Sequence, residues 1–403
     1  MDANRFLEIH DSHPNQINAE NCIQSLLAEM KLGLEGKGNI PMIPSYLSSS
    51  IEPPSNQFCC VLDAGGTNLR SATVYFDASG NSELRNVRIS SMPGTLHPLN
   101  SAELYHALAE EVECQQHNNR IGLCFSYNVT LNRFLDGPLD AWCKEILCPD
   151  AVGKPVGQSL KMALGCEQNI IHVLNDSAAS LLGSAKSGIP AQIGLILGTG
   201  VNVCYEEHCV NISKITEKLN SETMIISTEI GEYRGIPKST FDNLVISESN
   251  NPNLAQAEKQ CAGGYLGKQI CFAWTKASMD GLLPATFAEQ TFSLQEISHY
   301  IADPGISPIP DHPLAKDIAI LLISRAAKIA SILCAGPILL KNAKGTTRIA
   351  IEGSQFWKLE GFRSNFIREL TTILSPRNID FQICCTENSC LFGAALAAFA
   401  VPM

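Results

Sequence analysis

Two short glycine turns with hydroxyl side chains interrupt the apolar runs of this 403-residue chain. The first is Asp63-Ala-Gly-Gly-Thr-Asn, and the second is Gly198-Thr-Gly-Val-Asn. Because glycine has no Cβ atom, a ligand can approach its backbone closely, and amide and hydroxyl donors on such a turn form a cradle for an anion. Asp63 is suited to hold Mg²⁺ indirectly, through water. The alternative is a pair of hairpin turns with a capping aspartate.

A carboxylate in the segment VLNDSAASLL is placed for proton transfer. Asn175 and Asp176 lie where an apolar strand meets a helix, so we expect both side chains to point into the mouth between two domains. There Asp176 can accept the proton of a hydroxyl group that attacks phosphorus. It would serve equally well as an ordinary helix N-cap, and these residues alone leave both interpretations open.

Two glutamates stand beside glycines at the edges of expected elements, Glu229 in ISTEIGEY and Glu258 in AQAEKQCAGGYLGK. Together with Ser126, Asn175 and Asn202, they can form the paired hydrogen bonds that a polyhydroxylated ligand needs. The alternative is that both glutamates are solvated surface residues.

The elements that position these residues follow from hydrophobic periodicity. We expect strands at 58–76, 81–92, 120–129, 169–176, 347–353 and 379–385, and helices at 19–37, 101–115 (with a Ser N-cap), 177–186, 255–275, 312–333, 355–375 and 390–400. At residue 193 the order of apolar strand, glycine turn and alternating strand restarts. This weak internal repeat predicts an α/β protein with two related domains that face each other.

Composition narrows the class of protein. The net charge is −11 and the basic residues are scattered, which argues against nucleic-acid binding. The polar N-terminal stretch has no apolar signal core, and we expect a cytoplasmic protein. The most apolar segment, 318–340, carries Arg325 and Lys328 and ends at a Gly-Pro pair, so it is interpreted as a core helix rather than a membrane span.

Sixteen cysteines raise the question of disulfides or a metal site. The doublets at 59–60 and 384–385 lie in apolar runs, where thiols behave as small hydrophobic groups. A metal site at Cys204, His208 and Cys209 is the alternative. Reduced thiols are the preferred interpretation for the chain.

Seven segments, in order, resemble the hexokinase family of the actin-like ATPase fold, over nearly the whole chain. LDAGGTNLR resembles its first phosphate loop, and GLILGTGVNVCYEE its second. CFSYN with LDAWCKE resembles the sugar segment, and LNDSAASLL the segment with the catalytic base. STEIGEYRG, EKQCAGGYLG and IEGSQFWKLEGF match the remaining three.

This resemblance implies two actin-like ATPase (ribonuclease H-like) domains with a cleft between them. It implies a small domain of residues 56–190 plus 388–403 and a large domain of residues 1–45 plus 191–387. It also implies ATP and Mg²⁺ as cofactors, with the metal arriving on the nucleotide. A hexose and a nucleotide are the expected partners, with no membrane or nucleic-acid partner, and a homodimer remains open.

The resemblance also implies roles, position by position. Asp176 falls on the catalytic base, which takes the proton of the sugar 6-hydroxyl. The positions implied for the hexose are Ser126, Cys143, Lys144, Asn175, Asn202, Glu229 and Glu258. Those implied for the nucleotide are Asp63, Gly65, Gly66, Thr67, Asn68, Arg70, Gly198, Thr199, Gly200, Gly353 and Ser354.

Four departures from the family pattern predict altered affinities. Cys143 stands where a Thr is usual, which replaces a good hydrogen-bond donor by a weak one. Asn128 stands for Pro, and Val201 for Thr or Ser. The segment ENSCLFGAAL lacks the usual D-G-S-G-R/K pattern. The expected protein is a divergent, bacterial kinase.

We therefore expect an ATP:hexose 6-phosphotransferase, with glucose as the substrate. A kinase for mannose, fructose or an N-acetylhexosamine is one alternative, and a non-catalytic sugar sensor on the kinase fold is another. An actin-like ATPase that acts on proteins is the third, against which the paired Glu229 and Glu258 argue.

Overall fold

The computed structural model describes residues 1–116, 118–142, 146–401 and 403. Its first sheet has five strands in the order β4-β3-β2-β5-β8. Their bounds are β2 (Gln57–Ala64), β3 (Asn68–Phe76), β4 (Ser82–Ser91), β5 (Arg120–Phe125) and β8 (Ile170–Leu174). The last six residues of β2 are all buried, because β2 is a central strand that is covered on both faces. A separate short pair joins β6 (Asn128–Val129) and β7 (Leu139–Ala141).

The second sheet has six strands in the order β1-β11-β10-β9-β12-β13. Their bounds are β1 (Ile43–Pro44), β9 (Ile193–Leu197), β10 (Val201–His208), β11 (Thr223–Ser227), β12 (Gly345–Glu352) and β13 (Ile379–Cys384). In each sheet one strand, β2 or β9, pairs antiparallel with the next strand of a hairpin and parallel with a later strand, β5 or β12. The repeat expected from the sequence is therefore present, and the predicted fold of two related α/β units is confirmed.

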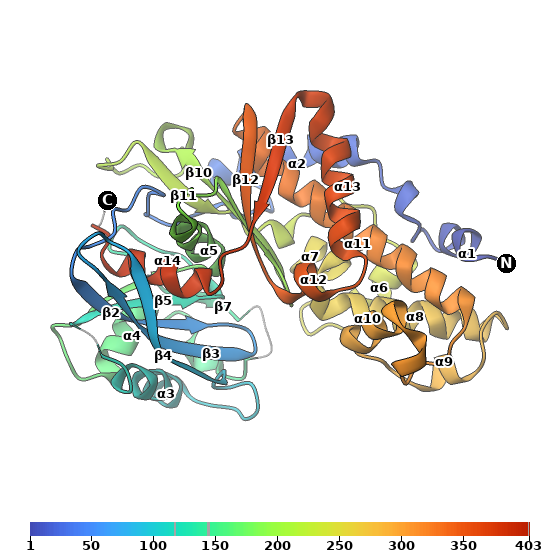
Figure 1. Ribbon diagram of the computed structural model, residues 1–403, viewed down its shortest axis with the longest axis horizontal. Coiled ribbons are helices and arrows are strands. Elements are labelled where there is room, and N and C mark those ends of the chain that lie inside the picture. The colour runs from blue at the N-terminus through green and yellow to red at the C-terminus, as the bar shows by residue number, and fades with distance from the viewer. Residues whose placement is uncertain (117, 143–145, 402) are drawn as a thin grey trace.

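Two helices, α5 (Asp176–Gly183) and α14 (Ser389–Ala398), join the sheets. They pack against each other, α14 contacts β2, β5 and β8, and α5 contacts β9 and β10. One hydrophobic cluster accordingly takes side chains from α5, α14 and both sheets. In Figure 1 these helices lie between the blue strands of the first sheet and the strands of the second. The predicted domain boundaries remain a prediction.

The remaining helices cover the outer faces of the sheets. Those of the first sheet are α3 (Ser101–Glu113) and α4 (Val156–Ala163). The other helices share one hydrophobic core with the second sheet. They are α1 (Ala3–Ile9), α2 (Ala19–Leu34), α6 (Thr240–Ser247), α7 (Gln256–Cys261), α8 (Gly263–Met279), α9 (Thr286–Glu289), α10 (Leu294–Ala302), α11 (Pro313–Leu340), α12 (Ser354–Lys358) and α13 (Phe362–Leu374).

Two expectations about helix ends were wrong. The N-cap of α3 is Asn100 rather than Ser101, because the Asn100 side chain accepts the N–H of Glu103 while Glu103 accepts the N–H of Asn100. Nor does α11 stop at its Gly-Pro pair. Pro337 lies inside the helix, which runs on to Leu340 because the buried face of α11 continues through Ile338.

Helix α11 is the centre of the larger core. By length and composition alone it could cross a membrane, but 78% of its most apolar window is buried inside the protein, as in a core helix. Arg325 is also buried, at 1% exposure, where both of its terminal nitrogens donate to Asp242, at 3.2 and 2.7 Å. Arg325, one of the two charges that argued against a membrane span, is therefore part of an internal ion pair.

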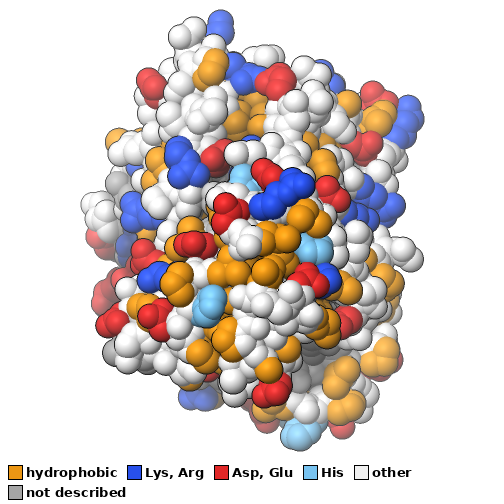
Figure 2. All heavy atoms as spheres, turned by 90° about the vertical axis from the view of Figure 1, so that its right-hand side faces the viewer, with side chains coloured by type: hydrophobic (Ala, Val, Ile, Leu, Met, Phe, Trp, Pro, Cys, Tyr) orange, Lys and Arg blue, Asp and Glu red, His pale blue; other side chains and the backbone are white. Residues whose placement is uncertain are grey.

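The surface charges are mixed. On the face at the right of Figure 1, Lys and Arg side chains are interspersed with Asp and Glu around a central group of hydrophobic side chains (Figure 2). This face has the scattered charge distribution that the composition indicated. Each cysteine that the structure describes is a free thiol.

Candidate active site

The first glycine turn is the tip of the β2–β3 hairpin. Gly65 donates its N–H to the Asn68 carbonyl at 3.0 Å, and the strands are paired up to Ala64 and Leu69. Thr67 and Asn68 are exposed. The hairpin interpretation is therefore right, and the exposed residues at its tip can be reached by a phosphate.

Asp63 lies on β2 directly opposite Arg70 on β3. Arg70 donates from Nε to Oδ2 of Asp63 at 2.8 Å, and its Nη2 contacts the same oxygen. Burial raises the pKa of Asp63, and the guanidinium of Arg70 opposes that shift. The Cys124 thiol is a further hydrogen-bond partner of Asp63, and the carboxylate is buried beside the first turn. A carboxylate at this position is the group that would hold Mg²⁺ through water.

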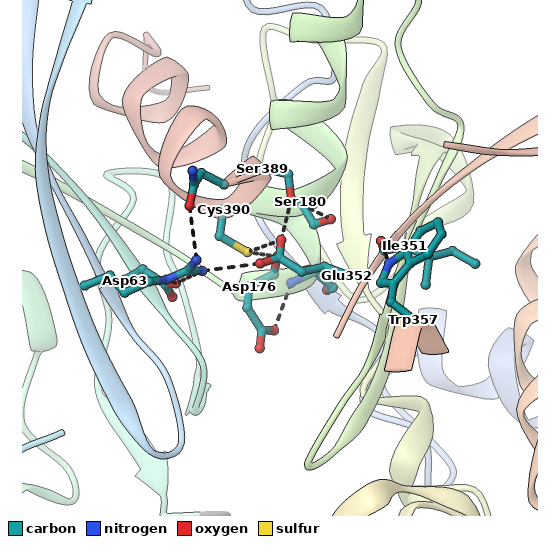
Figure 3. Close-up of polar contacts among 11 residues, drawn as sticks. Asp63, Asp176, Ser180, Ile351, Glu352, Trp357, Ser389 and Cys390 are labelled. Atoms are coloured by element: carbon teal, nitrogen blue, oxygen red, sulfur yellow. Dashed lines mark hydrogen bonds and ion pairs between the residues drawn. The ribbon is translucent and has the colours of Figure 1, made fainter. Parts of the chain in front are cut away.

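Arg70 also reaches the second sheet. Its Nη2 lies 3.3 Å from Oε1 of Glu352, the last residue of β12, while the hydroxyl of Ser389 and the thiol of Cys390 both donate to Oε2 of Glu352, the thiol at 3.1 Å. Figure 3 shows Glu352 to the right of Asp63, with Cys390 and Ser389 at the start of α14 close to its carboxylate. Sequence reasoning missed Glu352, although it stands directly before the glycine that was selected.

The second glycine turn is equally tight, since Gly198 donates its N–H to the Gly200 carbonyl at 3.1 Å. Gly353 packs against its base with a φ of +123°, and a Cβ there would lie 2.0 Å from the Leu197 carbonyl oxygen. Only glycine fits this position. Ser354 follows as the first residue of α12. The family-implied residues of the second loop and of the adenosine segment are thus in contact.

A cavity of about 390 Å³ opens beside this turn. Gly198, Thr199 and Ser354 line it, and the opposite walls come from α8 and α10. A second cavity, of about 740 Å³, contains Gly66 and Thr67 of the first turn together with Thr199 and Gly200 of the second. Because Thr199 lines both, the two cavities adjoin at the second turn, and both turns face one cleft.

Asn175, rather than Asp176, is the N-cap of α5. Its side-chain oxygen accepts the N–H of Ser177 at 2.9 Å, while Asp176 is the first helical residue. The capping alternative for Asp176 is therefore wrong. Oδ1 of Asp176 accepts the N–H of Ser177 at 2.8 Å, which fixes the carboxylate at the end of the helix. The Cys390 sulfur on α14 also lies 3.5 Å from the Asp176 carbonyl oxygen.

Asn175, Asn202 and Glu229 form one hydrogen-bonded group. The Asn202 amide donates to Oε1 of Glu229 at 2.7 Å and to Oδ1 of Asn175 at 3.3 Å. The Ser227 hydroxyl adds a bond of 3.1 Å to Oε1 of Glu229. Ser227 was missed, although it lies two residues before Glu229 at the end of β11. The sequence grouped Asn175, Asn202 and Glu229 as candidate ligands of one polyhydroxylated molecule, and the fold brings these three into contact.

The environment of Glu229 is unusual. Desolvation, together with the neighbouring Asp176 and Glu258 carboxylates, raises the pKa of Glu229 to about 7, against the hydrogen bonds from Ser227 and Asn202. Its backbone is left-handed, with a φ of +54°. Strain and a shifted pKa in one carboxylate are typical of a functional position.

Glu258 is a charged neighbour of Glu229 and contacts the second glycine turn. Its Oε2 accepts the N–H of Val201 at 3.0 Å, and a Cβ at Gly200 would lie 2.4 Å from that oxygen. Glu258 also lines the larger cavity. Glu258 therefore lies in the cleft, and the alternative that it is a solvated surface residue is wrong.

The structure describes only some of the remaining positions that the resemblance implies for the sugar. Ser126 is buried directly after β5 and donates its N–H to the Ala64 carbonyl at 3.1 Å, beside the first turn. Cys143 and Lys144 lie outside the described residues. Asn128 is the first residue of β6, opposite Ala141.

The alternative metal site does not form. Cys204 is buried, its thiol donates to the Ser177 carbonyl at 2.9 Å, and burial raises its pKa to about 12. Within residues 1–116, 118–142, 146–401 and 403, no three His, Cys, Asp or Glu side chains are grouped to hold a metal ion.

Two related α/β units that share a cleft, with one glycine hairpin from each, define the actin-like ATPase fold of sugar kinases. Comparison with known proteins agrees. Residues 8–186 and 192–400 match the two hexokinase family domains, and the chain belongs to the hexokinase family and is a hexose kinase.

Relatives span most of the chain. Hexokinase-7 of Oryza sativa subsp. japonica is 28% identical over 399 residues, which cover 87% of this chain and 86% of the relative. Hexokinase-1 of Saccharomyces cerevisiae is 26% identical over 401 residues, with 87% and 81% covered. The structure of the Schistosoma mansoni hexokinase complexed with glucose has a TM-score of 0.84 at 21% identity and covers 98% of each chain.

Proposed function

We propose that this hexokinase transfers the γ-phosphoryl group of ATP, bound as its Mg²⁺ complex, to the 6-hydroxyl of glucose. The observation that carries the proposal is the hydrogen-bonded group of Asn175, Asn202, Ser227 and Glu229 beside the Asp176 carboxylate. Amide and carboxylate groups in this arrangement suit a ligand with several adjacent hydroxyls, and Asp176 suits the hydroxyl that reacts.

The nucleotide is assigned to the two adjoining cavities. The smaller cavity, at Gly198 and Ser354, has room for a nucleoside, and the larger one contains the tips of both glycine turns. The turn amides would bind the phosphate oxygens, and Asp63 would hold a water of the metal complex.

Asp176 would act as the general base. Its fixed position at the first turn of α5 holds the carboxylate at the site where the sugar hydroxyl must lose its proton as it attacks phosphorus. Water carries the same reactive group as the sugar, so the site must exclude it. Hydrogen-bonding groups on both units, Asn175 on one and Asn202 and Glu229 on the other, would let a bound sugar draw the units together.

A kinase for another hexose is the second candidate function. Asn128 in β6, where the family has Pro, favours testing mannose, fructose and N-acetylhexosamines as alternatives to glucose. We also propose that the enzyme is cytoplasmic and acts on small molecules without membrane or nucleic-acid partners, in line with its net charge of −11 and its free thiols.

A coupled assay of ADP release, across a panel of sugars and nucleoside triphosphates, tests the proposal. We expect the highest kcat/KM with glucose and ATP and a requirement for Mg²⁺. A higher kcat/KM with another hexose would replace glucose as the substrate. If no sugar stimulated ADP release, the catalytic assignment would be wrong and sugar binding without turnover would be the better account.

A further inference from the structure

We propose that Lys268 binds the polyphosphate chain of the nucleotide, an assignment that rests on the proposed function. Lys268 lines the larger cavity together with the tips of both glycine turns, at Gly66 and Thr67 and at Thr199 and Gly200. Its side chain is exposed to solvent. A cation at this position faces the place where the phosphates of the nucleotide must lie.

The geometry of α8 directs Lys268 toward the second turn. Gly264, near the start of α8, donates its N–H to the Thr199 carbonyl at 3.0 Å, and a Cβ on Gly264 would lie 2.8 Å from that oxygen. The turn therefore rests on this face of the helix. Lys268 is four residues further on and lies on the same face, and helical side chains tilt toward the N-terminus of their helix. The ammonium group of Lys268 accordingly extends back toward Thr199.

The charges of the cleft leave this role open for Lys268. A triphosphate carries several negative charges, and its site already contains carboxylates, with Glu248 and Glu258 lining the same cavity. Arg70 is the nearest guanidinium to the first turn, but it is paired with both Asp63 and Glu352. A further cation at the cavity wall would add to the attraction that Mg²⁺ and the turn amides supply and would oppose the repulsion by these carboxylates.

The neighbouring lysine cannot supply that charge. Lys259 on α7 is fully buried, and its ammonium group donates to the carbonyls of Asn251 and Leu254 at 2.6 and 2.8 Å. Lys268, in contrast, has no ion pair with any residue that the structure describes. Among the described residues that line the larger cavity, it is the basic side chain available to a phosphate.

The test compares Lys268→Met and Lys268→Arg with the wild type. We expect Lys268→Met to raise KM for MgATP about tenfold, the effect of losing one hydrogen bond to a charged group, and to leave KM for the sugar unchanged. Lys268→Arg retains the charge and should restore most of the affinity. Calorimetry with inorganic tripolyphosphate and with adenosine separates the two parts of the nucleotide, and only tripolyphosphate binding should weaken.

Lys276→Met is the matched control. Lys276 is on the same helix, outside both cavities, and pairs with Asp280 at 2.6 Å. It should leave nucleotide binding unchanged, and thermal melting checks that each variant is folded. If Lys268→Met kept the wild-type KM for MgATP and the wild-type tripolyphosphate affinity, or weakened adenosine equally, Lys268 would be a solvated surface lysine. Wild-type turnover with MgATP tests the proposed function separately.

Discussion

Asp176 is the residue on which the chemistry depends. Asn175 caps α5, so the Asp176 carboxylate is not required for capping, and its replacement leaves the helix N-terminus satisfied. We expect Asp176→Asn to lower kcat by about 10²- to 10⁴-fold, the usual contribution of a general base, with sugar binding retained. Steady-state kinetics and sugar binding by calorimetry measure both quantities. A kcat near that of the wild type would rule out Asp176 as the base.

Glu229 should make sugar binding depend on pH. Its pKa is raised to about 7, so it loses its proton across the neutral range, and the ionised form is the better acceptor for sugar hydroxyls. We expect the sugar affinity of the wild type to increase as pH rises through about 7, and that of Glu229→Gln to be lower and independent of pH. An unchanged pH profile in Glu229→Gln would assign the titration to another group.

The same group affects stability in the opposite direction. The folded-state pKa of Glu229 lies above its value of 4.5 in the unfolded chain, so the folded protein binds the extra proton. This stabilising contribution is complete below about pH 4.5 and is lost as pH rises to about 7. Melting temperatures of the sugar-free wild type should therefore fall relative to Glu229→Gln across that interval.

At the scale of elements, the base of the second turn depends on one glycine. Gly353 combines a φ of +123° with a Cβ direction that ends 2.0 Å from the Leu197 carbonyl oxygen. We expect Gly353→Ala to lower the free energy of unfolding by more than about 2 kcal/mol and to raise KM for the nucleotide, because β9 and β12 must separate at the cavity wall.

Gly153 provides the comparison. It too has a positive φ, of +84°, but a Cβ there meets nothing within 4 Å. Gly153→Ala therefore measures the backbone strain alone, about 1 kcal/mol, with unchanged kinetics. Chemical denaturation of both variants separates the strain from the clash. Equal losses for the two variants would contradict the proposed contact.

At the scale of the whole molecule, Arg70 and Glu352 join the two sheets. The pair is about three-quarters buried, with 24% and 25% of the side chains exposed. A double-mutant cycle with Arg70→Gln and Glu352→Gln should give a coupling free energy of about 1 kcal/mol. The exposed pair of Arg85 and Glu83 within β4 should give a value near zero. No difference between the two cycles would mean that the pair does not hold the units together.

Local patterns predicted much of the fold and the site. Both hairpins, the strand that leads to Asn175 and the restart at residue 193 depend on glycines and apolar periodicity close in sequence. The long-range contacts could not be predicted in this way. Arg325 and Asp242 on one hand, and Arg70 and Glu352 on the other, meet only because packing of the finished fold brings their elements together. For the same reason, Pro337 is tolerated within α11, against its local preference.

The position of α14 along the chain has a consequence for synthesis. The five-stranded sheet ends at Leu174, but the helix that packs on β2, β5 and β8 begins only at Ser389. At translation rates of about 5–20 residues per second, that sheet waits roughly 10 to 40 seconds for its covering helix. During this interval the nascent chain exposes to solvent the apolar side chains that α14 later covers. The first unit can therefore complete its fold only after the residues between Leu174 and Ser389 have been translated.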